Sequence, residues 1–322
     1  MKIEMNYKEK YREFCKKEDD IPIFSKDWWL DAVCVDGEWD VALVEKGGQI
    51  VASMPYYIKQ DGMFNLMTMP TLTQTMGPYI KYPQGQKYYK KLSWEKEMMT
   101  ALIDQFPEVD TFNQSFHHSV TNWLPFYWKG FNSSVRYTYI VEDITIDELE
   151  KNFETDIRRR RRKATKLGIK VFEGSDIEIF YDLNMKTFKR QGMAKPYTLD
   201  FIKNIYNIAK KHNSCKMFFA KDADNQIIAA NFMIYDKNSV YYVMGGIEPT
   251  KKDLGAMDLV QYESIKFAIT TNRIFDFEGS MIESIEKYFR SFGAKQKPYL
   301  QIYKTNSKLW KLKSMVDGVL KR

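Results

Sequence analysis

The densest set of residues able to do chemistry is a run of cations near the middle of the chain. Residues 158–170 hold eight basic and no acidic side chains, including the five consecutive arginines 158–162. Arginine binds phosphate through paired N–H donors, so a run that no neighbouring acid neutralises favours an anionic ligand over a solvated face. We interpret Arg158, Arg161 and Arg162 as residues that contact a phosphorylated ligand.

A second stretch, residues 245–256, places small and basic residues just before an expected helix. These residues are Gly245, Gly246, Lys251, Lys252, Gly255 and Ala256. The glycines let a ligand approach the backbone, the lysines add charge, and the helix N-terminus offers unpaired N–H groups. The stretch predicts a phosphate site at the start of the helix.

Other reactive residue types form no recognisable site. The cysteines Cys15, Cys34 and Cys215 are odd in number and far apart, which argues against disulfides and against a zinc site. His117 and His118 are adjacent, so in a strand they would point to opposite faces and not converge on a metal. We therefore expect no metal and a reducing, cytoplasmic location.

An internal repeat determines the expected architecture. The first half reads as strands at 39–45, 49–59 and 63–69, a helix at 86–105 and a strand at 109–112. The second half repeats the order with strands at 216–221, 226–235 and 240–244, a helix at 255–271 and a strand at 274–277. Gln49-Ile50-Val51-Ala52 even matches Gln226-Ile227-Ile228-Ala229.

Helices also fill the middle of the sequence. We expect two linking helices within 146–166, the second ending at Gly168, a strand at 169–172, and helices at 176–190 and 199–211. Each half is therefore α+β, with an antiparallel meander followed by a crossover helix and a parallel strand. The predicted domains are 1–143 and 144–322, with mixed sheets and helices on both faces.

Two motifs resemble known acyltransferases. A strand followed by Lys252, Gly255 and a helix is similar to the acyl-CoA pyrophosphate loop of GNAT N-acetyltransferases, although Met257 stands where a small residue is usual. Residues 275–294 resemble the C-terminal signature of FemABX-like aminoacyl transferases, which end on an aromatic-Lys-x-x-Phe-Gly run. Here the run is Tyr-Phe-Arg-Ser-Phe-Gly, with Phe289 at the lysine position.

The resemblance extends over nearly the whole chain. Members of that family carry two GNAT-like halves joined by an arginine-rich helix, and the Trp28-Trp29 pair and the loop 71–78 match their first half. It implies tandem GNAT-like domains and transfer of an acyl or aminoacyl group to an amine. The implied donor is acyl-CoA or aminoacyl-tRNA, and the implied acceptor is a cell-envelope precursor such as an amino-sugar nucleotide or a peptidoglycan peptide.

The resemblance also implies roles for single residues. Glu278, just after the strand 274–277, is the expected base, and Tyr242 the expected proton donor to the leaving group. Backbone groups of Val243, Met244 and Gly245 would polarise the carbonyl. The remaining residues expected to bind substrate are Gln74, Tyr79, Trp29 and Arg290.

Each of these roles has a structural alternative. Glu278 would equally serve as a helix cap, Tyr242 as a core aromatic, and Trp29 as core packing. Gln74 and Tyr79 belong to a loop where turn chemistry alone explains them.

Charge distribution leaves a second class of function open. Residues 1–143 hold 16 basic and 20 acidic side chains, whereas residues 144–322 hold 33 and 22, so the net +7 conceals −4 and +11. A basic half rich in aromatics is also typical of a non-catalytic RNA- or nucleotide-binding protein on a degenerate acyltransferase fold. The basic tail 304–322 suggests either peripheral membrane contact or a core-packed last helix, and we favour the packed helix. No apolar run is long enough to cross a bilayer.

Overall fold

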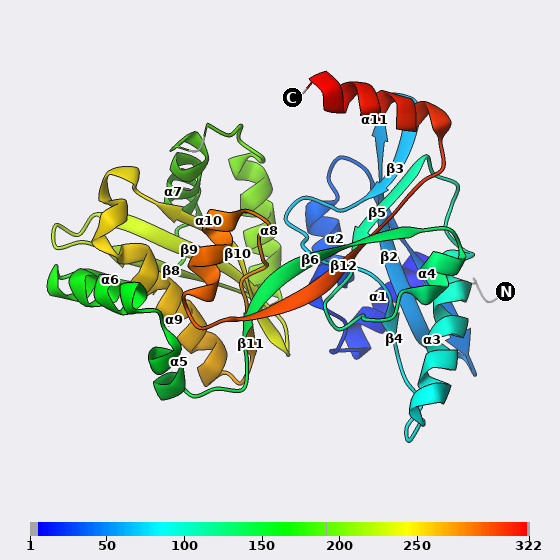
Figure 1. Cartoon of the computed structure of the whole chain (residues 1–322), viewed down its shortest axis with the longest axis horizontal. Coiled ribbons are helices and arrows are strands. Elements are labelled where there is room, and N and C mark those ends of the chain that lie inside the picture. Colours follow the sequence, from blue (N-terminus) through cyan, green and yellow to red (C-terminus); the bar gives the residue numbers. More distant parts are fainter. Residues whose placement is uncertain (1–5, 191, 321–322) are drawn as a thin grey trace. The chain divides into compact units, whose positions relative to one another are not determined.

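A computed structural model describes residues 6–190 and 192–320. The chain forms two compact units (Figure 1): unit 1 comprises residues 1–136 and 298–322, and unit 2 comprises residues 137–297. The predicted boundary at 143/144 therefore differs from the crossing at 136/137, and residues 298–322 return to unit 1 instead of ending unit 2. The backbone crosses between the units twice, once within each of two long strands.

Unit 1 begins with two helices and a meander of strands. Its elements are α1 (Tyr7–Lys17), α2 (Asp27–Val33), β1 (Glu38–Lys46), β2 (Gln49–Asp61), β3 (Phe64–Thr68), β4 (Tyr79–Ile80), α3 (Tyr88–Ile103), β5 (Thr111–Ser115), α4 (Leu124–Trp128) and α11 (Lys308–Leu320). The strands β1, β2 and β3 pair antiparallel, and β5 joins β3 in parallel. The helix α3 forms the crossover that a parallel pair requires.

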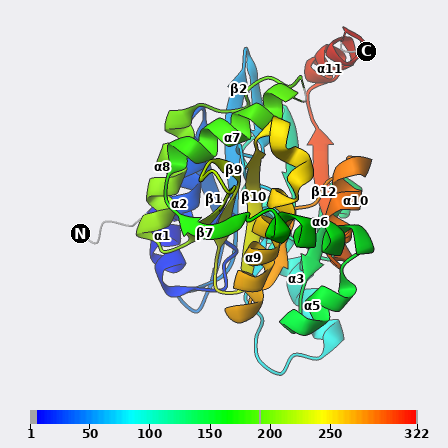
Figure 2. The same cartoon turned by 90° about the vertical axis from the view of Figure 1, so that its left-hand side faces the viewer.

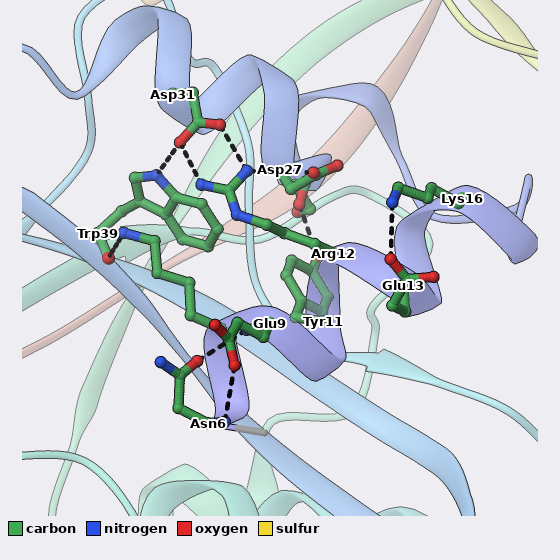
Figure 3. A network of polar contacts seen from close by, with 11 residues as sticks. Asn6, Glu9, Tyr11, Arg12, Glu13, Lys16, Asp27, Asp31 and Trp39 are labelled. Carbon is green, nitrogen blue, oxygen red and sulfur yellow. Dashed lines mark hydrogen bonds and ion pairs between the residues drawn. The ribbon is translucent and has the colours of Figure 1, made fainter. Parts of the chain in front are cut away.

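A polar network fixes the first helix of unit 1 (Figure 3). Asn6 and Glu9 form a reciprocal capping box at the start of α1. Arg12 binds Asp31 through two nitrogens, at 2.6 and 2.8 Å, and Trp39 Nε1 donates to the same carboxylate at 2.9 Å. One carboxylate on α2 thus ties α1 to β1.

Unit 2 repeats the plan of unit 1. Its elements are α5 (Ile146–Asn152), α6 (Thr155–Lys166), β7 (Lys170–Gly174), α7 (Ile177–Arg190), α8 (Leu199–Lys211), β8 (Cys215–Lys221), β9 (Ile227–Tyr235), β10 (Ser239–Ile247), the 3₁₀ turn η2 (Pro249–Leu254), α9 (Ala256–Thr270), β11 (Ile274–Asp276) and α10 (Glu283–Arg290). The strands β7 to β10 pair antiparallel in sequence order, and β11 joins β10 in parallel. The predicted repeat and the α+β fold class are confirmed.

Helices cover both faces of the sheet of unit 2 (Figures 1 and 2). Side chains alternate along β9: the ring of Phe232 packs against Phe180 of α7, whereas Met233 shares a core with Ile265 of α9. Almost all of β9 is buried, because helices lie on both of its faces.

Two strands lie outside the repeat. They are β6 (Asn132–Val141) and β12 (Lys295–Thr305), and each crosses from one unit to the other. In unit 1 the neighbour of β5 is β12, and in unit 2 the neighbour of β11 is β6. Both pairings join segments more than a hundred residues apart, which local sequence patterns do not reveal.

The last helix differs from our expectation. Leu309, Leu312 and Met315 of α11 are each more than half exposed, so this part of α11 is not core-packed. Trp310 does contact Phe64 edge to face, and Lys313 pairs with Asp61, so α11 contacts the turn between β2 and β3.

Candidate active site

The candidate site of unit 2 lies where β10 leaves β11. The parallel ladder joins only Ser239–Tyr241 to Ile274–Asp276, although β10 continues to Ile247 in pairing with β9. A β-bulge at Val243 interrupts the β9 ladder at the same place. Bulges redirect side chains and end pairing, and here one frees part of the backbone of β10 from its neighbour. The predicted carbonyl-binding residues 243–245 lie on this segment.

Tyr242 stands at the start of the freed segment. Its ring meets Phe289 edge to face at 6.1 Å, and its hydroxyl reaches the backbone of Gly245. A Cβ at Gly245 would come 2.0 Å from that hydroxyl oxygen, so only glycine leaves room for it. Burial raises the pKa of Tyr242 above its ordinary value, so the phenol is protonated at neutral pH and able to donate a proton.

The helix α7 packs against this segment of β10. Asn184 of α7 donates from Nδ2 to the carbonyl of Gly245 at 2.7 Å, and Tyr197 donates to Asn184 Oδ1 at 2.7 Å. A side chain on Gly246 would collide with the backbone of Leu183 and Asn184 at 2.4–2.5 Å. Both glycines therefore permit a close contact with protein. At Gly245 the contacting group is the Tyr242 hydroxyl, and at Gly246 it is the backbone of α7.

Glu278 follows β11 in an unusual conformation. Its φ is +62°, a left-handed value that non-glycine residues rarely adopt. Its backbone N–H donates to Oδ1 of Asp276 at 2.7 Å, and that carboxylate also accepts from Thr138. Burial raises the pKa of Glu278 well above its ordinary value, and the nearby Asp276 charge raises it further. A carboxylate with a raised pKa is a stronger base once ionised.

Asp276 is a second buried carboxyl group that the sequence analysis missed. Burial raises its pKa to about 6, against the lowering effect of its bond from Thr138. The sequence did indicate an unusual position, because Asp276 is a carboxylic residue between Phe275 and Phe277 in an otherwise apolar strand. Asp276 organises the turn that carries Glu278, and the two carboxyl groups interact electrostatically.

Glu278 and Tyr242 belong to opposite faces of the sheet. Tyr241 shares electrostatic contact with Asp276 and Glu278. Tyr242 is the next residue of β10 and packs on the other face, against Phe289 and the core around it. The two predicted catalytic residues thus flank the freed edge of β10 from two sides.

Two further residues missed in the sequence lie near Tyr242. The Tyr288 hydroxyl is fully buried without a hydrogen bond of good geometry, and its charge neighbours are Asp258 and Tyr242. Asp258, in the first turn of α9, pairs with Arg160 Nε at 2.8 Å. Burial raises the pKa of Asp258, and the Arg160 charge opposes that rise. Only the folded structure brings these distant segments together.

The helix α6 packs against the predicted phosphate site at the start of α9. Gly255, with φ +81°, lies against α6, because a Cβ there would meet the Arg160 carbonyl at 2.4 Å. Ala256 is fully buried, and Lys163 donates to the carbonyl of Asp253 at 2.9 Å. Lys251 pairs with Asp222, whereas Lys252 is exposed. The helix end is therefore packed against α6 on one side, and phosphate binding by residues 251–256 stays a prediction.

The arginine run divides between two sides of α6. Arg159 pairs with Asp156, and Arg160 with Asp258. Arg158, Arg161 and Arg162 line a hollow of about 360 Å³ together with Glu150, Thr165 and Lys166. The structure therefore brings together the three arginines that were expected to bind ligand.

The other predicted substrate residues are already engaged. Arg290 pairs with Glu154 and Glu286, at 3.4 and 3.2 Å. Gln74 donates to the Tyr299 hydroxyl at 3.0 Å. Tyr79 interacts with Glu18, and burial together with the charge of Glu18 raises the pKa of Tyr79. Trp29 is fully buried and donates to Thr73 at 3.0 Å, so it is a core residue of unit 1 and is not accessible to substrate.

The histidines and cysteines make no alternative site. His117 and His118 follow β5 in a turn, and their rings lie 4.2 Å apart, so they do not point to opposite faces as expected. All three cysteines are free, and burial raises their pKa values, to about 12 for Cys15. Within residues 6–190 and 192–320, no group of three or more His, Cys, Asp or Glu side chains could hold a metal ion.

Comparisons with known proteins identify related domains and folds. Residues 151–289 match the family model of the acetyltransferase (GNAT) domain. The crystal structure of FemX is 14% identical, with a TM-score of 0.67, over 93% of this chain and 97% of that one. A C-terminal DUF2156 domain of a proposed lysylphosphatidylglycerol synthetase from Agrobacterium fabrum is 12% identical, with a TM-score of 0.58, over 97% and 96%.

A third structure, L-PGS from Bacillus licheniformis, is 12% identical, with a TM-score of 0.56, over 100% of both chains. A search of curated protein sequences found no significant match. Among the helices described, none is long and apolar enough to cross a membrane. Residues 151–289 thus match a GNAT acetyltransferase domain, and the chain has the fold of FemX.

Proposed function

We propose that this chain, an acyltransferase with a GNAT domain and the fold of FemX, transfers an acyl group from a thioester donor to a primary amine in unit 2. The observation that carries the proposal is the freed edge of β10 within the GNAT domain, with protonated Tyr242 on one side and Glu278 on the other. Acyl-CoA is the donor that the domain match supports.

In the proposed reaction, Glu278 accepts a proton from the acceptor ammonium, directly or through a water. The free amine then attacks the thioester carbonyl, and a C–N bond forms. Backbone N–H groups of residues 243–245 stabilise the oxyanion. The C–S bond breaks as Tyr242 gives its proton to the leaving thiolate. The second proton lost by the attacking nitrogen returns to Tyr242, and Glu278 releases the first to solvent.

The names of the similar structures bear on the substrates. A lysylphosphatidylglycerol synthetase makes an aminoacylated lipid, which keeps aminoacyl-tRNA as a second donor for this chain. The acceptor we propose is an amine of a cell-envelope precursor, either an amino-sugar nucleotide or a peptidoglycan peptide. The free cysteines fit reaction in a reducing, cytoplasmic compartment.

The decisive experiment measures release of free thiol from acyl-CoA in the presence of an amine. We expect Glu278→Gln and Tyr242→Phe each to lower kcat by about 10²-fold or more, with KM for the donor little changed. Tyr303→Phe is the matched control, since that phenol is exposed on β12 and lies outside residues 151–289. Unchanged kcat in both site variants would refute the proposed roles.

A non-catalytic RNA-binding protein is the second candidate, supported by the basic face of α6. Its binding to RNA would weaken steeply with salt and disappear when that face is neutralised. The same chain would release no thiol from any acyl-CoA. A thiol assay and a salt titration on one preparation therefore separate the two functions.

A further inference from the structure

The helix α6 carries two chemically different sets of cations. On the face toward α9 and η2, Arg160 pairs with Asp258 and Lys163 donates to the Asp253 carbonyl. Arg159 is neutralised locally by Asp156, at 3.1 Å. Three of the cations in the run therefore serve internal contacts.

The remaining cations share the other face. Positions 158, 162 and 166 are spaced by four residues and position 161 by three, so all four side chains lie along one side of the helix. They line the hollow of about 360 Å³, in which Glu150 is the one acid. Four cations thus surround a space with a single carboxylate.

Arg161 is held in place at the base of this hollow. Its guanidinium carbon lies 3.5 Å from the ring centroid of Tyr262, and the ring of Phe153 is 5.1 Å away. One nitrogen pairs with Glu150 at 3.3 Å, whereas the buried Nε has no hydrogen-bond partner. A stacked arginine is preorganised, so binding an anion through its outer nitrogens costs it little conformational entropy.

The other cations are held loosely. Arg158 makes only long contacts, of 3.4 Å, to the Lys151 carbonyl and to Thr155. Arg162 and Lys166 are exposed, and within the described part of the chain no ion pair engages either of them. Their charges remain available to a ligand, which a self-neutralised surface would not offer.

We propose that this hollow, lined by Arg158, Arg161, Arg162 and Lys166, binds the phosphate or diphosphate group of a small phosphorylated ligand. Phosphate binding in this hollow does not depend on the proposed acyl transfer, so the two can be tested separately. The side chains of α6 would then supply the hydrogen-bond donors that bind the phosphate groups of a carrier held by unit 2.

The test is calorimetric titration of the full chain with inorganic pyrophosphate at low ionic strength. We expect a dissociation constant below about 1 mM for the unchanged chain. Each of the single variants Arg162→Gln and Lys166→Gln should raise that dissociation constant about tenfold. Arg159→Gln is the matched control, because it removes an arginine from the same helix outside the hollow. Coenzyme A and uridine diphosphate, titrated next, distinguish a donor from an acceptor as the source of the phosphate.

The outcomes are distinct. Pyrophosphate binding that is weakened about tenfold in Arg162→Gln and in Lys166→Gln, and unchanged in Arg159→Gln, supports the site even if no acyl transfer is ever detected. No binding of pyrophosphate at several millimolar, or equal weakening by Arg159→Gln, overturns it. Binding of tRNA with no binding of any small phosphate would also overturn it, in favour of a nucleic-acid surface.

Discussion

At the scale of single residues, the buried carboxyl group of Asp276 is the most unusual feature of unit 2. Its carboxylate accepts two hydrogen bonds, yet burial keeps its pKa near 6. In the unfolded chain the pKa would be about 3.9. The stability from the raised pKa is present below about pH 4 and is lost as the pH rises through 6.

We therefore predict that Asp276→Asn flattens the dependence of stability on pH. The amide keeps both acceptor contacts but cannot ionise, so the variant escapes a penalty of about 3 kcal/mol at pH 8. Thermal melts at pH 5 and pH 8 measure this, and the melting temperature of the wild type should fall more than that of the variant. Asp224→Asn, in an exposed turn, is the control. An equal fall in wild type and Asp276→Asn would contradict the assignment.

The residues of the candidate site were only partly predictable. Glu278 and Tyr242 stand in recognisable motifs, and the three arginines of the hollow share a helical spacing. Tyr288 and Asp258 were not predictable, because their meeting depends on how α9 and α10 pack. Trp29 is a core residue, which is the alternative that the sequence also allowed. A tryptophan pair looks the same in a sequence whether it binds a ligand or packs in a core.

At the scale of elements, the meander of each unit could be predicted almost to the residue. Alternating apolar side chains and the turns between them determine β1–β3 and β8–β10. The packing of α6 on α9 could not be predicted, because it rests on Gly255, whose role reads equally as phosphate binding. A small residue indicates close approach but not what approaches.

The α6–α9 contact gives a prediction about Gly255. An alanine there would meet a backbone carbonyl at 2.4 Å and keep a left-handed φ of +81°. We expect Gly255→Ala to lower the melting temperature clearly more than Gly48→Ala, which has a φ of +75° but nothing within 4 Å. Because both positions have a positive φ, the difference between the two shifts in melting temperature measures the steric cost at Gly255 apart from backbone strain. Equal shifts would mean that α6 does not press on this glycine.

At the scale of the whole molecule, the two units differ in how the chain builds them. Unit 2 is one continuous stretch, 137–297, whereas unit 1 needs residues from both ends of the sequence. Tyr299 and Ile302 of β12 are buried in unit 1, and β12 pairs with β5. The predicted boundary at 143/144 missed this because strand pairing across such a distance leaves no local trace.

We predict that the fragment 137–297 folds alone and that the fragment 1–143 does not. The first keeps all strands of its sheet, and the second exposes the edge of β5 that β12 covers. Cooperative thermal melting and dispersed amide signals would identify the folded fragment. Joining residues 298–307 to 1–136 through a flexible linker should restore folding to the first unit. A chimera that stays unfolded would show that the open edge of β5 is not what prevents the fragment 1–143 from folding.

The double crossing of the backbone has a consequence for biosynthesis. Residues 137–297 are all synthesised before β12, the strand that unit 1 still lacks, is complete. At about 5–20 residues per second, the interval between residues 136 and 305 lasts roughly 10 to 30 s. During that time the nascent first unit holds an open sheet edge, so the half that is made first is the half that finishes folding last.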